Sequence, residues 1–208
     1  HGIVVAEVAQ LFDTLTLMRQ NYVAKSLELR KARRDPVTQL ASRALFLELA
    51  REQVARVEAA PGKALALLFV DLDNFKQVND RMGHDTGDKV LQGVAQALVH
   101  SVRDLDLVGR YGGDEFLVCL EAPHSAVEAI TDQAAQRILA QVAEVGFGIG
   151  CSIGCALHHP GATVDDLIDA ADRAMMEAKR AGKNRVVRAP APDAQAATST
   201  LPPSSLTG

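Results

Sequence analysis

The sequence lacks three features that would point to particular classes of protein. Its 22 Lys and Arg residues do not outnumber its 26 Asp and Glu residues, and the net charge is −4. No global positive field therefore favours a nucleic-acid partner. No run of roughly eighteen apolar residues occurs, so the sequence predicts no membrane contact from this segment. A signal-peptide pattern and an initial Met are also missing, so we expect a piece of a longer protein.

Cysteine is scarce, and its three copies all lie in apolar, strand-like runs at Cys119, Cys151 and Cys155. Cys151 and Cys155 are four residues apart and share one face of a strand. No second pair or flanking histidine suggests a metal site. We expect buried, reduced thiols in a cytoplasmic protein.

A long helix is expected over residues 1–34. Apolar residues recur there in steps of four and three, which is the heptad pattern of a coiled coil, at Val4, Val8, Leu11, Leu15, Met18 and Tyr22. One narrow stripe has nothing of its own to pack on, so we favour a coiled-coil homodimer and a signalling helix. The alternative is an amphipathic helix that folds back on its own domain.

Residues 35–188 alternate between strand and helix patterns. Asp35-Pro36 ends the first helix, because the residue before proline avoids the α region. The patterns predict strands over residues 64–70, 151–157 and 185–187, and helices over residues 45–57, 89–99, 126–142 and 164–181. This order predicts an α+β (α/β layered) fold, a central sheet containing antiparallel strands with helices on its faces. Residues 189–208 are Pro, Ala, Ser and Thr without periodicity, typical of a disordered tail.

Residues 110–120, RYGGDEFLVCL, organise the chain around a polar turn. Gly112-Gly113 between strand-like runs predicts a tight hairpin in which both glycines take positive φ. Asp114 and Glu115 would then leave the turn together at the lip of the sheet. The alternative is a solvated hairpin tip without chemistry.

A second carboxylate, Asp71, ends the apolar run of residues 64–70 just before a helix expected near Phe75. Free N–H groups at that helix start, with Lys76 beside them, suit a phosphate. Two carboxylates facing each other suit a divalent ion that bridges phosphate oxygens, as Mg²⁺ does. On its own, Asp71 could equally be a strand-end cap.

Residues 82–88 predict a polar loop before a helix. Asn79 and Asp88 offer an amide and a carboxylate that can together bind the edge of guanine. Asp88 as a plain helix N-cap is the competing interpretation. We expect His84 to shape this loop.

Five motifs, in order, resemble the GGDEF family of bacterial diguanylate cyclases. Residues 35–46 resemble DxLTGLxNRRxF, residues 69–80 FxDxDxFKxxND, residues 83–91 GHxxGDxxL, and residues 110–116 are RYGGDEF. Ser152-Ile153-Gly154 and residues 171–184 resemble the closing segments. The chain departs from the family pattern at four positions, Gln39, Ser42, Ala44 and Met176.

The resemblance implies synthesis of cyclic di-GMP from two GTP on a ferredoxin-like, nucleotidyl-cyclase βαββαβ core. It implies that Mg²⁺, or Mn²⁺ in its place, is held by Asp71, the Leu72 carbonyl and Asp114, and that Asp114 and Glu115 assist deprotonation. The substrate-binding positions it implies are Asn74, Phe75, Lys76, Asn79, His84, Asp88, Lys179 and Lys183. It further implies a homodimer controlled by an upstream sensor domain.

Arg103 and Asp106 resemble the family's RxxD site, at which the product inhibits the enzyme. Arg can bind phosphate and stack on guanine, while Asp accepts from the guanine edge. A surface ion pair is the alternative. For the whole domain, the alternatives to an active cyclase are a catalytically silent cyclic di-GMP receptor and a dimerisation scaffold.

Overall fold

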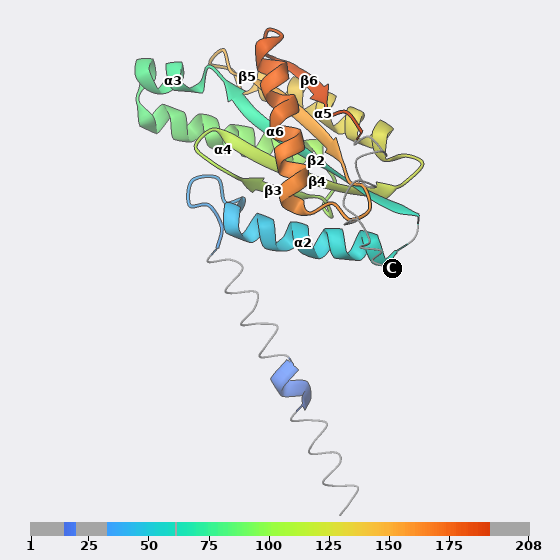
Figure 1. Ribbon diagram of the computed structural model, residues 1–208. Coiled ribbons are helices and arrows are strands. Elements are labelled where there is room, and N and C mark those ends of the chain that lie inside the picture. Colours follow the sequence, from blue (N-terminus) through green and yellow to red (C-terminus); the bar gives the residue numbers. More distant parts are fainter. Residues whose placement is uncertain (1–14, 20–32, 61, 192–208) are drawn as a thin grey trace, which may run out of the picture.

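The computed structural model describes residues 15–19, 33–60 and 62–191, and a six-stranded sheet lies at its centre (Figure 1). The strands are β1 (Ala41–Ser42), β2 (Lys63–Asp73), β3 (Leu107–Arg110), β4 (Glu115–Pro123), β5 (Gly150–Leu157) and β6 (Arg185–Arg188). The helices around this sheet are α2 (Arg43–Ala59), α3 (Phe75–Met82), α4 (His84–Ser101), α5 (Val127–Glu144) and α6 (Val164–Arg180).

The strand order is β1-β3-β4-β2-β5-β6. The four inner strands are antiparallel, because β2 pairs with β4 on one side and β5 on the other, and β3 pairs with β4. With α3 and α4 between β2 and β3, and α5 between β4 and β5, these strands form the βαββαβ core. The short strands β1 and β6 add to the two edges in parallel. The expected fold class is confirmed.

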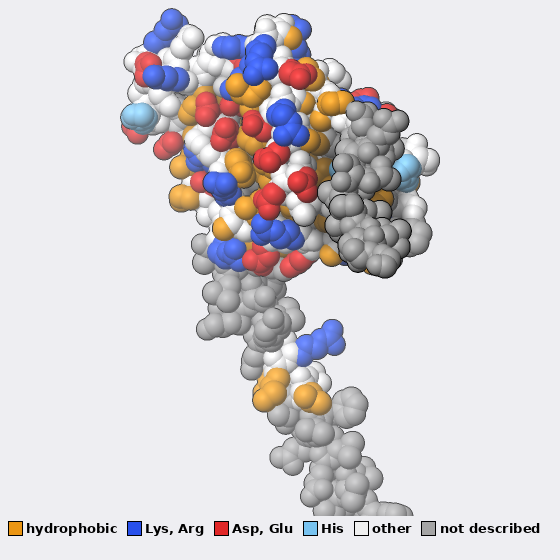
Figure 2. Space-filling model, viewed as in Figure 1, with side chains coloured by type: hydrophobic (Ala, Val, Ile, Leu, Met, Phe, Trp, Pro, Cys, Tyr) orange, Lys and Arg blue, Asp and Glu red, His pale blue; other side chains and the backbone are white. Residues whose placement is uncertain are grey.

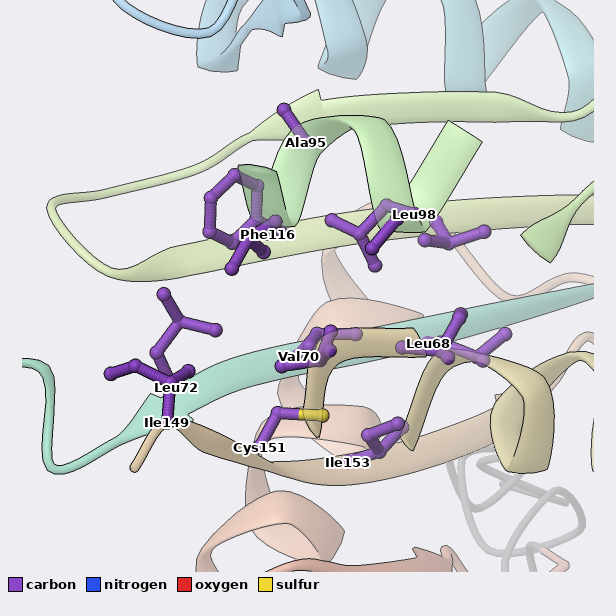
Figure 3. Close-up of a cluster of buried hydrophobic side chains, with 14 of the residues drawn as sticks. Leu68, Val70, Leu72, Ala95, Leu98, Phe116, Ile149, Cys151 and Ile153 are labelled. Atoms are coloured by element: carbon purple, nitrogen blue, oxygen red, sulfur yellow. The ribbon is translucent and has the colours of Figure 1, made fainter. Parts of the chain in front are cut away.

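Strand β2 has neighbours on both edges and helices over both faces. Because successive strand residues point to opposite faces, Leu68, Val70 and Leu72 pack toward α4 and α5 (Figure 3). Leu67 and Phe69 pack toward α2 and α6 on the other face. Every residue of β2 after Lys63 is buried, which explains why the strand reads as a continuous apolar run.

The same alternation decides which side chains reach α6. Asp71 and Asp73 follow Phe69 at steps of two and therefore lie on the α6 face of the sheet. Glu115 precedes Leu117 by two on β4 and lies on that face as well. The sequence patterns placed the end of this strand at residue 70, three residues early. The strand continues because β4 and β5 both pair with its last residues, as in the pairs Asp71 with Glu115 and Asp73 with Gly150.

The predicted N-terminal helix falls largely outside the described residues. Residues 15–19 are helical, and Leu15, Leu17 and Met18 are exposed (Figure 2). Arg33 lies in a turn and Arg34 forms an isolated β-bridge with Ala41, so neither residue is helical as the sequence patterns expected. The coiled coil stays a prediction.

At the other end of the chain, the Ala189 N–H donates to the Cys155 carbonyl at 2.7 Å, so ordered pairing extends one residue past the expected boundary at 188. The predicted disordered tail beyond residue 191 lies outside the described residues. The three cysteines are buried and free, as expected, and burial raises the pKa of each thiol. Within the described part of the chain, no helix has the length and apolar character needed to cross a membrane.

At Gly154 the backbones of β5 and α6 approach each other closely. A Cβ at this position would overlap with the carbonyl oxygen of Ala171 and the backbone nitrogen of Met175, neither of which can rotate away. We expect Gly154→Ala to lower the free energy of unfolding by about 3 kcal/mol or more, because the helix must move off the sheet. Chemical denaturation measures this. Gly113→Ala is the matched control, since a Cβ there meets nothing within 4 Å, and an equal loss in both variants would contradict the explanation.

Candidate active site

An open cleft of about 480 Å³ lies at the end of β2. Every residue predicted to hold metal or phosphate lines it, together with three residues that the sequence patterns did not single out. The lining residues are Asp71, Leu72, Asp73, Asn74, Phe75, Lys76, Gln77, Asp80, Asp114, Lys179 and Lys183. A larger cavity of about 1020 Å³ lies between α6 and the segment that follows β6, and none of the predicted site residues lines it.

The two predicted metal carboxylates are neighbours. The Leu72 N–H donates to the Asp114 carbonyl at 3.1 Å, which fixes the signature turn against the end of β2. Asp71 and Glu115 are partners in the pairing of β2 with β4. Asp114, Glu115 and Asp71 thus converge on one end of the sheet, as the predicted metal site requires.

The carboxylates repel one another in a partly buried place. Burial raises the pKa of Asp71, Lys179 lowers it, and the negative charges of Asp114 and Asp73 raise it again, with a net upward shift. The pKa of Glu115 is also raised, first by burial and then by Asp71 and Asp114. Lys179 Nζ lies 2.7 Å from Asp71 Oδ2 and supplies a cation from α6. Figure 2 shows acidic and basic side chains interleaved over the face of the domain that α6 covers.

This donor set fits a divalent ion. Among the described residues, no three His, Cys, Asp or Glu side chains gather closely enough to hold a metal by themselves. Mg²⁺ commonly takes one or two protein carboxylates and completes its shell with phosphate oxygens and water. Asp71, Asp114 and the Leu72 carbonyl offer oxygen ligands of the kind that Mg²⁺ takes. A cation would also offset the negative charges of Asp114 and Asp73, which add to the effect of burial in raising the pKa of Asp71.

Arg110 braces the signature turn, a role that the sequence patterns did not reveal. Its Nη2 donates to the Gly113 carbonyl at 2.6 Å, and its Nε donates to the carbonyls of Gly112 and Gly113 at 3.1 and 3.2 Å. Its Nη1 donates to Asp35 Oδ1 at 3.1 Å. That oxygen also accepts from the N–H and hydroxyl of Thr38. The motif that begins at Asp35 therefore positions the turn that carries Asp114.

The expectation that both turn glycines take positive φ is wrong. Neither Gly112 nor Gly113 is among the glycines with positive φ, and the connection between β3 and β4 has four residues, Tyr111 to Asp114. The N–H groups of Tyr111 and Gly112 both donate to the Glu115 carbonyl. Gly112 leaves room for the Glu115 side chain, because a Cβ there would force Glu115 Oε2 to move.

The predicted loop over residues 82–88 is also wrong, because α4 begins at His84 with Gly83 at φ 81° before it. Asp88 therefore lies inside the helix and is not its N-cap, and His84 is an exposed residue of its first turn. Gly87 lies inside this helix and has no room for a side chain, since a Cβ there would overlap with Asn79 Oδ1.

Asn79 on α3 thus packs against the residue before Asp88 on α4. Asn79 Oδ1 is buried and has no hydrogen-bond partner, while Asp88 is exposed. A buried amide oxygen without a partner is costly in a finished protein, and a bound ligand can supply the missing donor. Neither Asn79 nor Asp88 lines the cleft at the end of β2, so the expected guanine site stays a prediction.

The start of α3 suits phosphate. Asn74 precedes the helix in the left-handed conformation at φ 67°, and no side chain caps the first turn. Lys76 is exposed in that turn. Lys183 Nζ, from the turn after α6, donates to Asn74 Oδ1 at 3.1 Å. Two cations and free N–H groups therefore face the cleft beside the carboxylates.

The RxxD residues lie in a different place. Asp106 Oδ2 accepts from the Arg103 backbone N–H at 2.9 Å, so these residues form a turn through the backbone rather than an ion pair between side chains. They line a cavity of about 460 Å³ with Arg56, Lys63 and Glu121, among others. Lys63 begins β2 and Asp71 is eight residues on, a separation of about 26 Å along the strand.

Arg137 does not line the cavity at the RxxD turn, but its charge acts on Asp106, and the sequence patterns missed it. Burial raises the pKa of Asp106, while the backbone N–H groups of Arg103 and Glu121 and the charges of Arg103 and Arg137 lower it, with a net upward shift. Arg137 Nε also donates to the Ser101 carbonyl, which holds α5 against the end of α4. Only tertiary packing brings this arginine to the turn, because it lies 31 residues after Asp106.

The four departures from the family pattern leave the cleft intact. Gln39 stands at φ 60°, the conformation that explains a preference for glycine there. Ser42 caps α2 by accepting from the Leu45 N–H. Ala44 and Met176 are exposed. None of the four lines the cleft.

Comparison with known proteins shows the same domain. The family profile described as "Diguanylate cyclase, GGDEF domain" matches residues 32–185, well over half of the chain. The chain belongs to the GGDEF family.

Similar proteins include the diguanylate cyclase DosC of Escherichia coli K12, which is 34% identical over 180 residues, 83% of this chain and 38% of DosC. The GGDEF chain therefore spans well under half of that curated relative. Among solved structures, the diguanylate cyclase SiaD with its activator SiaC, from Pseudomonas aeruginosa, has a TM-score of 0.73 at 32% identity, over 89% of this chain and 72% of SiaD.

The coiled coil and GGDEF domain of DgcB from Caulobacter crescentus, in complex with cyclic di-GMP, has a TM-score of 0.70 at 28% identity. The match covers 87% of this chain and 98% of that one.

The brace between Arg110 and Asp35 makes stability depend on pH. Burial alone would raise the pKa of Asp35, but hydrogen bonds from Thr38 and Arg110 hold it below the ordinary value. A lowered carboxyl pKa stabilises the fold above the unfolded pKa, and this contribution is lost as pH falls through the folded pKa. We expect Asp35→Asn to cost about 1–3 kcal/mol of unfolding free energy at pH 7. The difference from the wild type should shrink toward zero in strong acid.

Denaturant titrations of the wild type and of Asp35→Asn, from pH 7 down to strong acid, measure the effect. Asp169→Asn, at an exposed position on α6, is the control and should change neither the stability nor its pH profile. A difference that stays constant down to strong acid would contradict the role of the Asp35 charge.

Proposed function

We propose that this GGDEF domain is a diguanylate cyclase that condenses two GTP into cyclic di-GMP and releases two pyrophosphates. The observation that carries the proposal is the cleft at the end of β2. It joins Asp71 and Asp114 to the uncapped start of α3 and to Lys179 and Lys183. Carboxylates for a metal and cations for a triphosphate are the two requirements of phosphoryl-transfer chemistry.

Asp71, Asp114 and the carbonyl of Leu72 would hold Mg²⁺, or Mn²⁺ in its place. A bound ion supplies charge neutralisation on the triphosphate and acidifies the attacking hydroxyl. In the reaction, the 3′-hydroxyl oxygen of one GTP attacks the α-phosphorus of a second GTP. The bond from that phosphorus to the pyrophosphate oxygen breaks, and the 3′-hydroxyl loses its proton. Asp114 and Glu115 would assist the removal of this proton. The raised pKa of Glu115 improves it as a proton acceptor.

The remaining residues of the cleft, together with three residues outside it, would bind GTP. Backbone groups of Asn74, Phe75 and Lys76, with the side chains of Lys179 and Lys183, suit the phosphates. The unpartnered amide of Asn79 and the exposed carboxylate of Asp88 suit the guanine edge, with His84 nearby on the same helix turn.

The product needs two nucleotides, whereas each chain has one such cleft among its described residues. Two copies must therefore face each other, and the exposed apolar side chains of residues 15–19 suit a helix pair that keeps them together. Sedimentation equilibrium, run beside rate measurements over one dilution series, tests this. A monomer with undiminished specific activity would contradict it. Since similar proteins are longer, we further propose that the domain is the cytoplasmic output of a larger signalling protein with an upstream sensor.

The direct test is incubation with GTP and Mg²⁺, followed by chromatography of the products. We expect cyclic di-GMP and pyrophosphate in a ratio of one to two. Binding of cyclic di-GMP without any turnover of GTP would instead support the silent receptor, and dimerisation without binding of either nucleotide would support the scaffold.

Asp114→Asn tests the metal site with a change of charge at nearly constant volume. We expect turnover to fall by about 100-fold or more, because a metal-binding carboxylate supplies several kcal/mol of transition-state stabilisation. Thermal unfolding should remain close to that of the wild type, since Asp114 lies in the open cleft. Asp104→Asn, in the distant RxxD turn, is the control. Turnover within threefold of the wild type in Asp114→Asn would exclude the assignment.

The RxxD turn is proposed as a product-binding site. Arg103, Asp106, Arg56 and Lys63 surround a cavity that shares no lining residue with the GTP cleft, and Arg137 adds positive charge nearby. Guanidinium groups and a carboxylate are suited to phosphates and the guanine edge, respectively.

Arg103→Ala should leave the initial rate near that of the wild type, because the residue is remote from the cleft. It should abolish the slowing of the reaction as cyclic di-GMP accumulates. Progress curves with and without added cyclic di-GMP measure this. Curves of the variant and the wild type that overlay at high product would refute the inhibitory role.

A further inference from the structure

Asp73 is a buried carboxylate at the end of β2 that no step of the proposed reaction uses. Only 4% of it is exposed. Its oxygens lie 3.0 and 3.1 Å from the hydroxyl of Ser152, which is fully buried on β5. Its Oδ2 also accepts from the backbone N–H of Asn184 at 2.9 Å. One carboxylate therefore joins three separate segments of the chain.

These contacts run across the α6 face of the sheet. Asp73 pairs with Gly150 of β5, and Ser152 of β5 pairs with Arg185, the first residue of β6. Asn184 immediately precedes β6. Its side chain fits over Gly150, where an added Cβ would lie 3.0 Å from Asn184 Oδ1. The carboxylate thus reaches over the intervening strand to hold the turn that connects α6 to β6.

That turn carries Lys183 in a conformation that needs support. Lys183 and Asn184 have φ values of 63° and 46°, the left-handed region that side chains rarely adopt. Such residues persist only where surrounding contacts compensate for the strain. The Lys183 N–H is bound to the Ala178 carbonyl, which closes the end of α6, and the Asn184 N–H is bound to Asp73. The second contact fixes the direction in which Lys183 leaves the helix.

We propose that Asp73, supported by Ser152, is a positioning residue that holds Lys183 at the phosphates of bound GTP. The inference rests on the proposed function, in which Lys183 binds the triphosphate. Both neighbours donate to this carboxylate, the Ser152 hydroxyl and the Asn184 N–H. An asparagine could keep both contacts only with the Ser152 hydroxyl turned round to accept, and it would lose the negative charge that strengthens them. Lys183 Nζ, 3.1 Å from Asn74 Oδ1, then stays beside the start of α3.

The test is a double-mutant cycle with Asp73→Asn, Lys183→Ala and both changes together. The probe is the α,β-methylene analogue of GTP with Mg²⁺, which cannot release pyrophosphate, and calorimetry gives its affinity. We expect Asp73→Asn to weaken binding about tenfold, the effect of one lost charge-assisted contact. The double variant should bind no more weakly than Lys183→Ala alone, since Asp73 acts through Lys183. Additive losses would overturn the proposal.

Two further variants separate positioning from other effects. Ser152→Ala removes one partner of Asp73 and leaves the charge of the protein unchanged. We expect it also to weaken binding of the analogue. If Asp73→Asn weakened binding only by reducing the attraction for Mg²⁺, Ser152→Ala would have no effect. If Asp73→Asn does not fold, Ser152→Ala combined with Lys183→Ala carries the cycle instead. Asp166→Asn is the matched control, because Asp166 also accepts from a backbone N–H, that of Thr163, at the opposite end of α6. It should leave the affinity unchanged.

The failures are distinguishable. A wild-type chain that does not bind the analogue would overturn the proposed function and this inference together. A wild-type chain that binds it, with unchanged affinity in Asp73→Asn and Ser152→Ala, would overturn this inference alone.

Discussion

The pairing of β2 with strands on both of its edges is the constraint on which the rest of the structure depends. It buries every residue of this strand after Lys63 and requires helices over both faces. It also carries Asp71 and Asp73 into the interior at the strand end, where unpaired charges would be costly. The fold supplies partners for both carboxylates. Lys179 of α6 pairs with Asp71, while Ser152 of β5 and the N–H of Asn184, just before β6, bind Asp73.

The two carboxylates illustrate two uses of a buried charge. The oxygens of Asp73 accept hydrogen bonds from Ser152 and Asn184, so this carboxylate holds neighbouring segments of the chain together. Asp71 lies near the negative charge of Asp114 and forms an ion pair with Lys179, and its pKa is raised. Such an arrangement favours a cation at Asp71 and a rigid frame at Asp73. Residues only two positions apart on one strand face therefore serve different purposes, because the neighbours on the adjacent strands differ.

The sequence predicted the layers well, since apolar alternation and length identify strands and helices without knowledge of the fold. It was less successful where spacing between elements decides the backbone. Gly112 was expected to provide positive φ, but it provides room for Glu115. Gly83 and Gly87 were expected in a loop, but Gly87 lies within α4, where Asn79 of the preceding helix leaves no room for a side chain. In both cases the glycine is explained by the position of another side chain, one within the same turn and one from a neighbouring helix.

The sequence by itself determined the identity of the family, the order of the main strands and helices, and most of the residues that line the cleft, because these follow from local patterns and from motifs that stand in a fixed order. Only the tertiary structure decided how those residues are held. The brace of Arg110 on Asp35 spans 75 positions of the chain, and the reach of Asp73 to Asn184 spans 111. Such contacts arise from strand register and helix packing, and a linear pattern carries no direct record of either.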